Sequence, residues 1–414
     1  MLEVETTWGG WGEEIQNDPY PHFAEMRGRC PVHAVRLGDG HDAFLVVGHD
    51  AARQALRDPR LSKDMLAAMG ADPDVVDEGL PGPAFARHML AVDPPDHTRL
   101  RGMVAKAFVP SRIAALAPRL ERIAEDLLDE LERSGPVVDL VSGFALPFPF
   151  RVIGELLGVP EADQPPLHDA FRRLFQPWSG SPPPDAVAAS DFVVGYLEHL
   201  VDEHQRVPSD DLVGVLVQAG DELTRQELLS SLFQLIVAGH DTTTSLIGNG
   251  MVALLDHPDQ LRLLRAEPQR IPEAVEEVIR FDAPVPHATF RVTTEAVELG
   301  GVEVPAGQQV LVCIGGANHD PAAHVDPERF DIARTPKPHL GFGHGIHFCL
   351  GAPLARLEGR IAFGALLRRF PDIALAVPRA ELQWSHGDGL VLRGLAELPV
   401  RLFPNHNQPT PGRP

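Results

Sequence analysis

The chain has 414 residues, of which 44% are hydrophobic, which is enough for one large core or two. Its 36 basic and 58 acidic residues give a formal net charge of −22, which argues against nucleic acid or an anionic membrane surface as a partner. The three cysteines form no disulfide framework, and the first 30 residues contain no apolar run of signal or membrane length. We therefore expect a cytoplasmic protein without a membrane anchor.

Amphipathic helical patterns dominate the chain, with no internal repeat. A long helix is expected over 111–133, with Ser111 as its N-cap, Gly135 past its end and Pro118 marking a bend or break. The longest helix is expected over 224–256, where Thr224 and Glu227 form a capping box. Short β-like runs are few, at 43–47, 302–312 and 389–402.

This pattern predicts a mainly α fold with small β-sheets in one catalytic domain over 1–404. Two segments, 65–89 and 176–185, are expected to be irregular because they are rich in glycine or proline. Residues 405–414 are expected to form a disordered tail.

The most informative stretch is 342–351, which reads Phe-Gly-His-Gly-Ile-His-Phe-Cys-Leu-Gly. Gly343 and Gly345 allow a tight turn that approaches a flat ligand, and a helical pattern follows. Amide N–H groups at the turn and helix start are expected to point at the Cys349 sulfur and lower the pKa of the thiol. A thiolate held in this way is a strong axial ligand for haem iron.

Two ordinary interpretations of Cys349 compete with this one. A lone cysteine is most often a small buried hydrophobe, but the surrounding glycines serve no purpose in a plain core helix. A zinc site needs about four ligands, and His344, His347 and Cys349 have no second Cys/His pair at a suitable spacing.

The stretch resembles the haem-binding loop of the cytochrome P450 family, Phe-Gly-x-Gly-x-His-x-Cys-x-Gly, with every fixed position filled. The resemblance covers nearly the whole chain, with motifs in family order, and is greatest to soluble bacterial members. It implies haem b held between two long helices. Cys349 is then the axial metal ligand, with Phe342 and Gly351 in the cofactor-binding loop.

A second motif, Ala-Gly-His-Asp-Thr-Thr-Thr at 238–244, interrupts the centre of the longest helix. Gly239, Asp241 and Thr242 are weaker helix formers than their neighbours and favour a local widening or kink. An exposed polar turn is the ordinary alternative, although apolar residues flank the segment. The motif is similar to the family's catalytic acid–alcohol pair. Asp241 would then supply protons, Thr242 would hold a water and the oxygen to be split, and Gly239 would make room for dioxygen.

Two further groups of residues match family motifs. Glu277 and Arg280 lie at i and i+3 on one helix face, where a surface ion pair is the ordinary alternative. With Arg329, they resemble the family's buried structural triad. Four cationic donors, each of which could also be a surface charge, match the family's haem propionate contacts: His97, Arg101, Arg291 and His347.

By resemblance, the substrate pocket is lined by parts of 65–89 and 171–196, although each position could equally belong to ordinary core. The single residues assigned to it are Val237, Ala238, Val285, Leu390 and Val391.

The resemblance implies a monooxygenase that inserts one atom of O₂ into an apolar small molecule by hydroxylation or epoxidation. By analogy, the substrate is a bacterial secondary metabolite such as a polyketide or macrolide. No flavin or nicotinamide motif is visible, so electrons are expected from a ferredoxin/reductase pair. The expected docking residues are Lys106, Arg112, Arg356 and Arg360.

Two alternatives remain open. A peroxide-driven haem-thiolate peroxygenase is disfavoured by the Asp241–Thr242 pair, which such relatives usually lack. A haem sensor or carrier without turnover would leave the disruption of the long helix at Asp241 and Thr242 unexplained.

Overall fold

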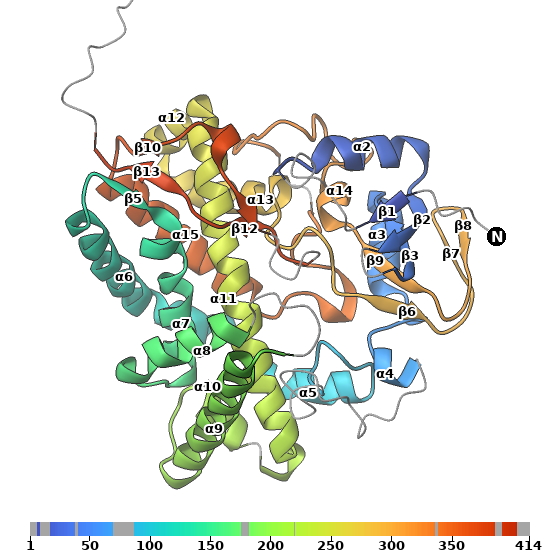
Figure 1. Cartoon of the computed structure of the whole chain (residues 1–414), viewed down its shortest axis with the longest axis horizontal. Helices are drawn as coiled ribbons and strands as arrows, with labels where there is room; N and C mark the ends of the chain where they lie inside the picture. Colours follow the sequence, from blue (N-terminus) through green and yellow to red (C-terminus); the bar gives the residue numbers. More distant parts are fainter. Residues whose placement is uncertain are drawn as a thin grey trace, which may run out of the picture.

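The computed structural model describes residues 6–8, 17–37, 40–68, 87–174, 182–218, 220–335, 338–385 and 391–403. The predicted tail, residues 405–414, and most of 65–89 lie outside these ranges. The described fold is mainly helical with small sheets, as expected (Figure 1). Its α-helices are α2 (Tyr20–Arg29), α3 (His49–Arg57), α4 (Met65–Ala68), α5 (Asp96–Ala105), α6 (Pro110–Arg133), α7 (Pro147–Leu157), α8 (Gln164–Leu174), α9 (Pro184–Arg206), α10 (Leu212–Val217), α11 (Arg225–Asp256), α12 (Pro258–Ala266), α13 (Ile271–Phe281), α14 (Ile314–Asn318) and α15 (Ala352–Arg369).

Helix α11 runs through the middle of the molecule, between a helical part and a part that contains the largest sheet (Figure 1). Its start confirms the predicted capping box, because the Thr224 side chain accepts from the Glu227 N–H and the Glu227 carboxylate accepts from the Thr224 N–H. Helix α11 also packs closely on α15. A Cβ atom at Gly250 would collide with the Phe363 ring, so a glycine there allows the two helices to approach.

The second long helix, α6, starts one residue before the predicted range. Pro110 occupies its first turn, and Val109 is the N-cap, so the prediction of Ser111 as N-cap is wrong. Proline favours the first helical turn because its missing N–H has no intrahelical partner there. Pro118 lies inside α6 without ending it, and Gly135 follows the helix with a φ of 126°.

The largest sheet has six strands in the order β1-β2-β3-β9-β6-β4. The predicted run at 302–312 forms two separate strands, because a turn with Gly307 at a φ of 75° divides it. The strands of the large sheet are β1 (Thr6–Trp8), β2 (Val32–Leu37), β3 (Asp42–Val46), β4 (Leu61–Ser62), β6 (Arg291–Thr293) and β9 (Gln309–Val312). The smaller sheets contain β5 (Val137–Asp139), β7 (Val297–Leu299), β8 (Val302–Val304), β10 (Ala374–Leu375), β11 (Trp384–Ser385), β12 (Gly394–Leu395) and β13 (Pro399–Arg401).

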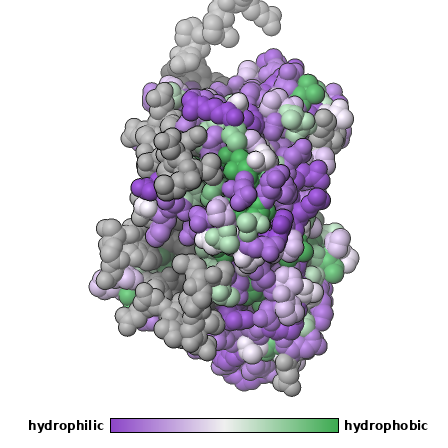
Figure 2. All heavy atoms as spheres, turned by 90° about the vertical axis from the view of Figure 1, so that its right-hand side faces the viewer, coloured by the Kyte–Doolittle hydropathy of each residue, from purple (hydrophilic) through white to green (hydrophobic). Residues whose placement is uncertain are grey.

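The face of the molecule that carries the six-stranded sheet is mainly hydrophilic, with apolar side chains scattered over its described surface (Figure 2). Within the described ranges, no helix combines the length and the apolar character that crossing a membrane requires.

Candidate active site

The loop before α15 folds as its glycines predict. Gly343 and Gly345 have φ values of 72° and 80°, a conformation that favours glycine. A hydrogen bond from the Cys349 N–H to the Phe342 carbonyl, 2.8 Å long, closes the loop. The close approach made by Gly345 is to α3, since a Cβ there would lie 2.8 Å from the Leu56 carbonyl oxygen. This glycine therefore allows the loop to pack against α3, and its approach to a flat ligand stays a prediction.

Cys349 lies three residues before the start of α15, where the backbone amides of Gly351 and Ala352 act to lower the pKa of its thiol. Burial raises the pKa of the thiol, and the two amides and the Arg101 charge only partly oppose this rise. The prediction of a lowered pKa is therefore wrong for the protein by itself. Bound metal changes this balance, because coordination deprotonates a thiol outright.

The Cys349 side chain is accessible, although protein atoms surround it closely enough to raise its pKa. This combination suits a ligand atom that faces a bound group. The zinc alternative lacks a ligand set, since the described residues include no group of three His, Cys, Asp or Glu side chains placed to hold a metal ion.

The four predicted propionate donors converge on the Cys349 loop. His97 and Arg101 lie one turn apart on α5, and the ring centroids of His97 and His347 are 4.4 Å apart. Arg101 Nη2 donates to the Phe348 carbonyl oxygen at 2.6 Å. Burial lowers the pKa of His347 to about 3, and the charge of the nearby Arg291 on β6 contributes to this shift.

These donors fit the carboxylate end of a haem. The Nε2 atoms of His97 and His347 and the Nε atom of Arg291 are buried, with no hydrogen-bond partner in the described part of the chain. Burial lowers the pKa of Arg291 to about 10, and burial together with the Arg291 charge lowers that of Lys63 to about 7. A buried guanidinium and two buried imidazoles with unused nitrogen atoms favour a bound anion, and two propionates would supply it.

The acid–alcohol segment lies at the centre of α11, which remains regular α-helix through residues 238–244. The Thr242 hydroxyl donates to the Ala238 carbonyl oxygen at 2.7 Å. Asp241 is more than a third exposed, and its Oδ1 lies 3.1 Å from His240 Nδ1. A Cβ at Gly239 would lie 2.7 Å from Ile153 Cδ1, so the structure assigns this glycine to close packing of α11 on α7. This contact does not test the expectation that Gly239 makes room for dioxygen, which stays a prediction.

The predicted pocket residues are only partly described. Val237 and Ala238 precede the acid–alcohol segment on α11, and Ala238 is exposed although Leu235 and His240 beside it are buried. Val285 and Val391 are half-buried. Leu390 lies outside the described residues.

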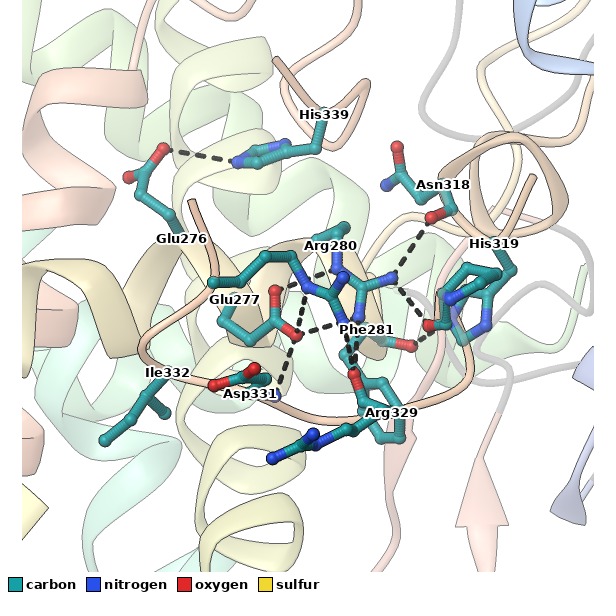
Figure 3. Close-up of polar contacts among 12 residues, drawn as sticks. Glu276, Glu277, Arg280, Phe281, Asn318, His319, Arg329, Asp331, Ile332 and His339 are labelled. Atoms are coloured by element: carbon teal, nitrogen blue, oxygen red, sulfur yellow. Dashed lines mark hydrogen bonds and ion pairs between the residues drawn. The ribbon is translucent and has the colours of Figure 1, made fainter. Parts of the chain in front are cut away.

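Glu277 and Arg280 on α13 form a fully buried ion pair. Arg280 Nε and Nη2 each donate to a Glu277 carboxylate oxygen at 2.8 Å, and both side chains are at most 5% exposed. The remaining Arg280 donors reach backbone carbonyls of Asn318, Pro327 and Arg329 (Figure 3). The alternative of a surface ion pair is excluded because both side chains are buried, and the pair also ties α13 to two distant segments of the chain.

The third member of the network differs from the prediction. Arg329 is exposed and contributes only its backbone carbonyl to Arg280. The second guanidinium on Glu277 is that of Arg334, whose Nε lies 3.2 Å from Oε1 and whose side chain is 14% exposed. Arg334 thus replaces Arg329 as the side chain that completes the buried network.

We predict that Arg334→Ala lowers the free energy of unfolding by about 1–3 kcal/mol, because a buried carboxylate loses a charged donor. Arg329→Ala is the matched control, because it keeps the carbonyl that Arg280 uses, and it should change stability by less than about 0.5 kcal/mol. Chemical denaturation of both variants measures the difference. Equal losses in the two variants would contradict the assignment of Arg334.

Sequence reasoning missed a buried acid next to the site. Glu358 on α15 is 2% exposed, and its Oε2 lies 3.5 Å from the Thr243 hydroxyl on α11. Burial raises the pKa of Glu358 well above its usual value. A signal was available, because Leu354 and Ala362 lie one helical turn before and after it on the same buried face.

Comparisons with known proteins agree with this geometry. Residues 150–374 match the sequence model of the family Cytochrome P450. The chain is 44% identical over 403 residues to the cytochrome P450 monooxygenase PikC of Streptomyces venezuelae, covering 95% of this chain and 93% of PikC. It is 42% identical over 407 residues to the 6-deoxyerythronolide B hydroxylase of Saccharopolyspora erythraea, covering 93% and 96%. The solved structure of the polyketide synthase cytochrome P450 PksS of Bacillus subtilis superposes with a TM-score of 0.87 at 39% identity, covering 94% of this chain and 98% of that one.

The mainly helical fold with a cysteine loop before α15 is thus that of a known enzyme family. The chain belongs to the cytochrome P450 family and is a monooxygenase. The cofactor of this family is an iron haem with a thiolate ligand.

Proposed function

We propose that Cys349 is the axial thiolate of haem b in this enzyme and that the enzyme oxidises a polyketide with electrons from a ferredoxin. When bound, the haem supplies the chemistry that splits dioxygen. The observation that supports the ligand assignment is the accessible Cys349 side chain in the glycine loop before α15, where two backbone amides favour its thiolate.

The residues of this chain would take three parts in that reaction. His97, Arg101, Arg291 and His347 would hold the propionates with donor atoms that otherwise lack partners. The Thr242 hydroxyl, now on the Ala238 carbonyl, would hold a water at the reacting oxygen, and Asp241 would pass protons to that water. The Glu277 network would keep the fold and the haem in place.

The substrate class is inferred from relatives and from the pocket. The relative PksS is named as a polyketide biosynthesis cytochrome P450, and another relative is named as a 6-deoxyerythronolide B hydroxylase. The assigned pocket positions Val237, Val285 and Val391 are aliphatic and half-buried, which suits an apolar substrate.

The test is turnover of the purified haem protein with a panel of polyketide macrolactones. We expect product when NADH, a ferredoxin and its reductase are supplied under oxygen, and little product with hydrogen peroxide alone. Product that forms with peroxide and not with the electron-transfer proteins would overturn the proposal in favour of a peroxygenase. Binding of haem without a substrate-induced spin-state shift or product across the panel would overturn the substrate class.

The proposed site of electron entry is a cavity of about 500 Å³ beside the Cys349 loop. Phe342, Phe348, Arg356 and Arg360 line it, and Phe348 is 41% exposed. Arg356 lies over the Phe342 ring, and its Nε donates to Glu276 at 2.6 Å. Burial alone would raise the pKa of Glu276, but Arg356 and His339 lower it to about 2, so this ion pair persists at neutral pH.

Arg360, one turn after Arg356 on α15, is exposed and is therefore the cation available to an acidic partner. We predict that Arg360→Glu slows ferredoxin-supported reduction by about tenfold at low salt and leaves substrate affinity unchanged. Salt should slow the unmodified enzyme more than the variant, because exposed charges are screened beyond ~8–10 Å. Stopped-flow reduction measures both effects, with Arg265→Glu, on the distant helix α12, as the control.

A rate of ferredoxin-supported reduction that changes neither with salt nor with the Arg360 substitution would rule out this docking surface. Arg356→Glu is a poorer test, because it would also place two carboxylates together and disturb the fold.

A further inference from the structure

A cluster of three rings, from the buried Phe150 and His240 and the half-buried His168, lies beside Asp241 and belongs to no assigned part of the site. His240 on α11 packs edge-to-face on Phe150 of α7 and on His168 of α8, with ring centroids 5.2 Å and 5.3 Å apart. Phe150 and His168 also contact each other, at 4.7 Å. Contact with both rings, each nearly perpendicular to it, leaves the His240 imidazole little freedom to rotate.

The fixed imidazole contacts the proton-supplying acid. Its Nδ1 lies 3.1 Å from Asp241 Oδ1, which is an ion-pair distance, so the edge of the imidazole that bears Nδ1 faces this carboxylate. Its Nε2 is buried and has no hydrogen-bond partner within the described ranges. A core histidine kept only for packing would usually satisfy both nitrogens, whereas this ring makes its single polar contact with Asp241.

Asp241 itself has few other constraints. Its side chain is 38% exposed, whereas that of His240 is 9% exposed. An exposed carboxylate on a helix surface populates several rotamers, and only some of them reach both bulk water and the Thr242 hydroxyl. A rigid donor on the preceding residue selects among these rotamers.

We propose that His240 is a positioning residue for proton delivery, which holds the Asp241 carboxylate in one rotamer through Nδ1–H while Phe150 and His168 hold the imidazole. This inference rests on the proposed role of Asp241 and names the group that controls its geometry. His168 contributes to the cluster by packing. Burial and the neighbouring His240 lower its pKa to about 4, so it is neutral at pH 7 and brings no charge to Asp241.

Two variants of His240 separate the hydrogen bond from the ring. His240→Phe keeps an aromatic ring among Phe150 and His168 but removes the donor, whereas His240→Asn places an amide N–H near the position of Nδ1. We expect His240→Phe to lower product formed per NADH by about tenfold or more, the effect of one lost hydrogen bond to a charged group. Its solvent isotope effect on turnover should rise, and His240→Asn should recover most of the loss.

Three controls complete the experiment. His204→Phe breaks another buried His–Asp pair, in which Nε2 lies 3.0 Å from Asp211 Oδ2, and should not change coupling or the isotope effect. His168→Phe should also leave both unchanged. In Asp241→Asn, adding His240→Phe should have no further effect, because the two residues act together.

Thermal unfolding and the reduced carbon monoxide spectrum check that each variant is folded and holds haem. An intact His240→Phe variant with unchanged coupling and isotope effect would overturn the inference, as would a His168→Phe variant with an equal defect, which would indicate an imidazole relay. Failure of the proposed function is distinct, because the unmodified enzyme would then give no NADH-dependent product.

Discussion

Replacement of Cys349 by histidine is expected to abolish the long-wavelength Soret band of the reduced carbon monoxide complex, and product formation should fall below detection. The band depends on a thiolate ligand, and a neutral imidazole donates too little electron density to support O–O cleavage. Haem should still bind, because the proposed propionate donors His97, Arg101, Arg291 and His347 remain unchanged. Absorbance spectra and haem content of the purified variant measure both expectations.

The other two thiols provide the control. Cys30 is half-buried and Cys313 is fully buried, where burial raises its pKa to about 12. Cys30→Ser should retain the normal band and full turnover. A normal band in Cys349→His, or its loss in Cys30→Ser, would refute Cys349 as the ligand.

Thr242→Ala should separate NADH consumption from product formation. NADH would still be oxidised, while product per NADH falls by about tenfold or more, as expected for the loss of a positioned proton-donating group. The missing electrons should appear as hydrogen peroxide. Product formation depends on the Thr242 hydroxyl in this proposal. The hydroxyl donates to the Ala238 carbonyl oxygen in the structure, and during the reaction it would rotate to hold a water.

Thr244→Ala is a closely matched control for this experiment. Its hydroxyl makes the same kind of backbone hydrogen bond on the same helix, at 3.2 Å from the His240 carbonyl oxygen. Both variants lose one such bond, so any effect on helix stability should be shared. Product per NADH that stays at the level of the unmodified enzyme in Thr242→Ala would show that Thr242 is not the alcohol that delivers protons. An equal fall in Thr244→Ala would show the same.

Local chemistry made several features predictable from the sequence. The capping box of Thr224 and Glu227 involves groups three residues apart, so a single helical turn brings them together. Gly343 and Gly345 adopt positive φ because the tight loop before Cys349 requires it. The spacing of His97 and Arg101 places both on one face of α5. Each of these depends on neighbours within a few residues.

Family motifs extended this prediction to residues far apart in the chain, with one error. The motif that contains Arg329 pointed to the right segment but to the wrong side chain. Arg329 lies at the surface and Arg334 turns inward to Glu277, and this difference arises from how the 325–334 segment packs against α13. Residue type could not distinguish the two arginines, because both have the charge and reach that the network needs.

The sequence by itself determined the glycine loop before Cys349, the long helix that carries Asp241 and Thr242, and the mainly helical class, because each depends on residues close together in the chain. Only the tertiary structure decided what surrounds these groups. It placed Ile153 against Gly239, enclosed His240 between Phe150 and His168, and buried Glu358 beside Thr243. It also reversed the expected pKa shift of Cys349, because burial depends on segments that come together only on folding and outweighs the nearby amides.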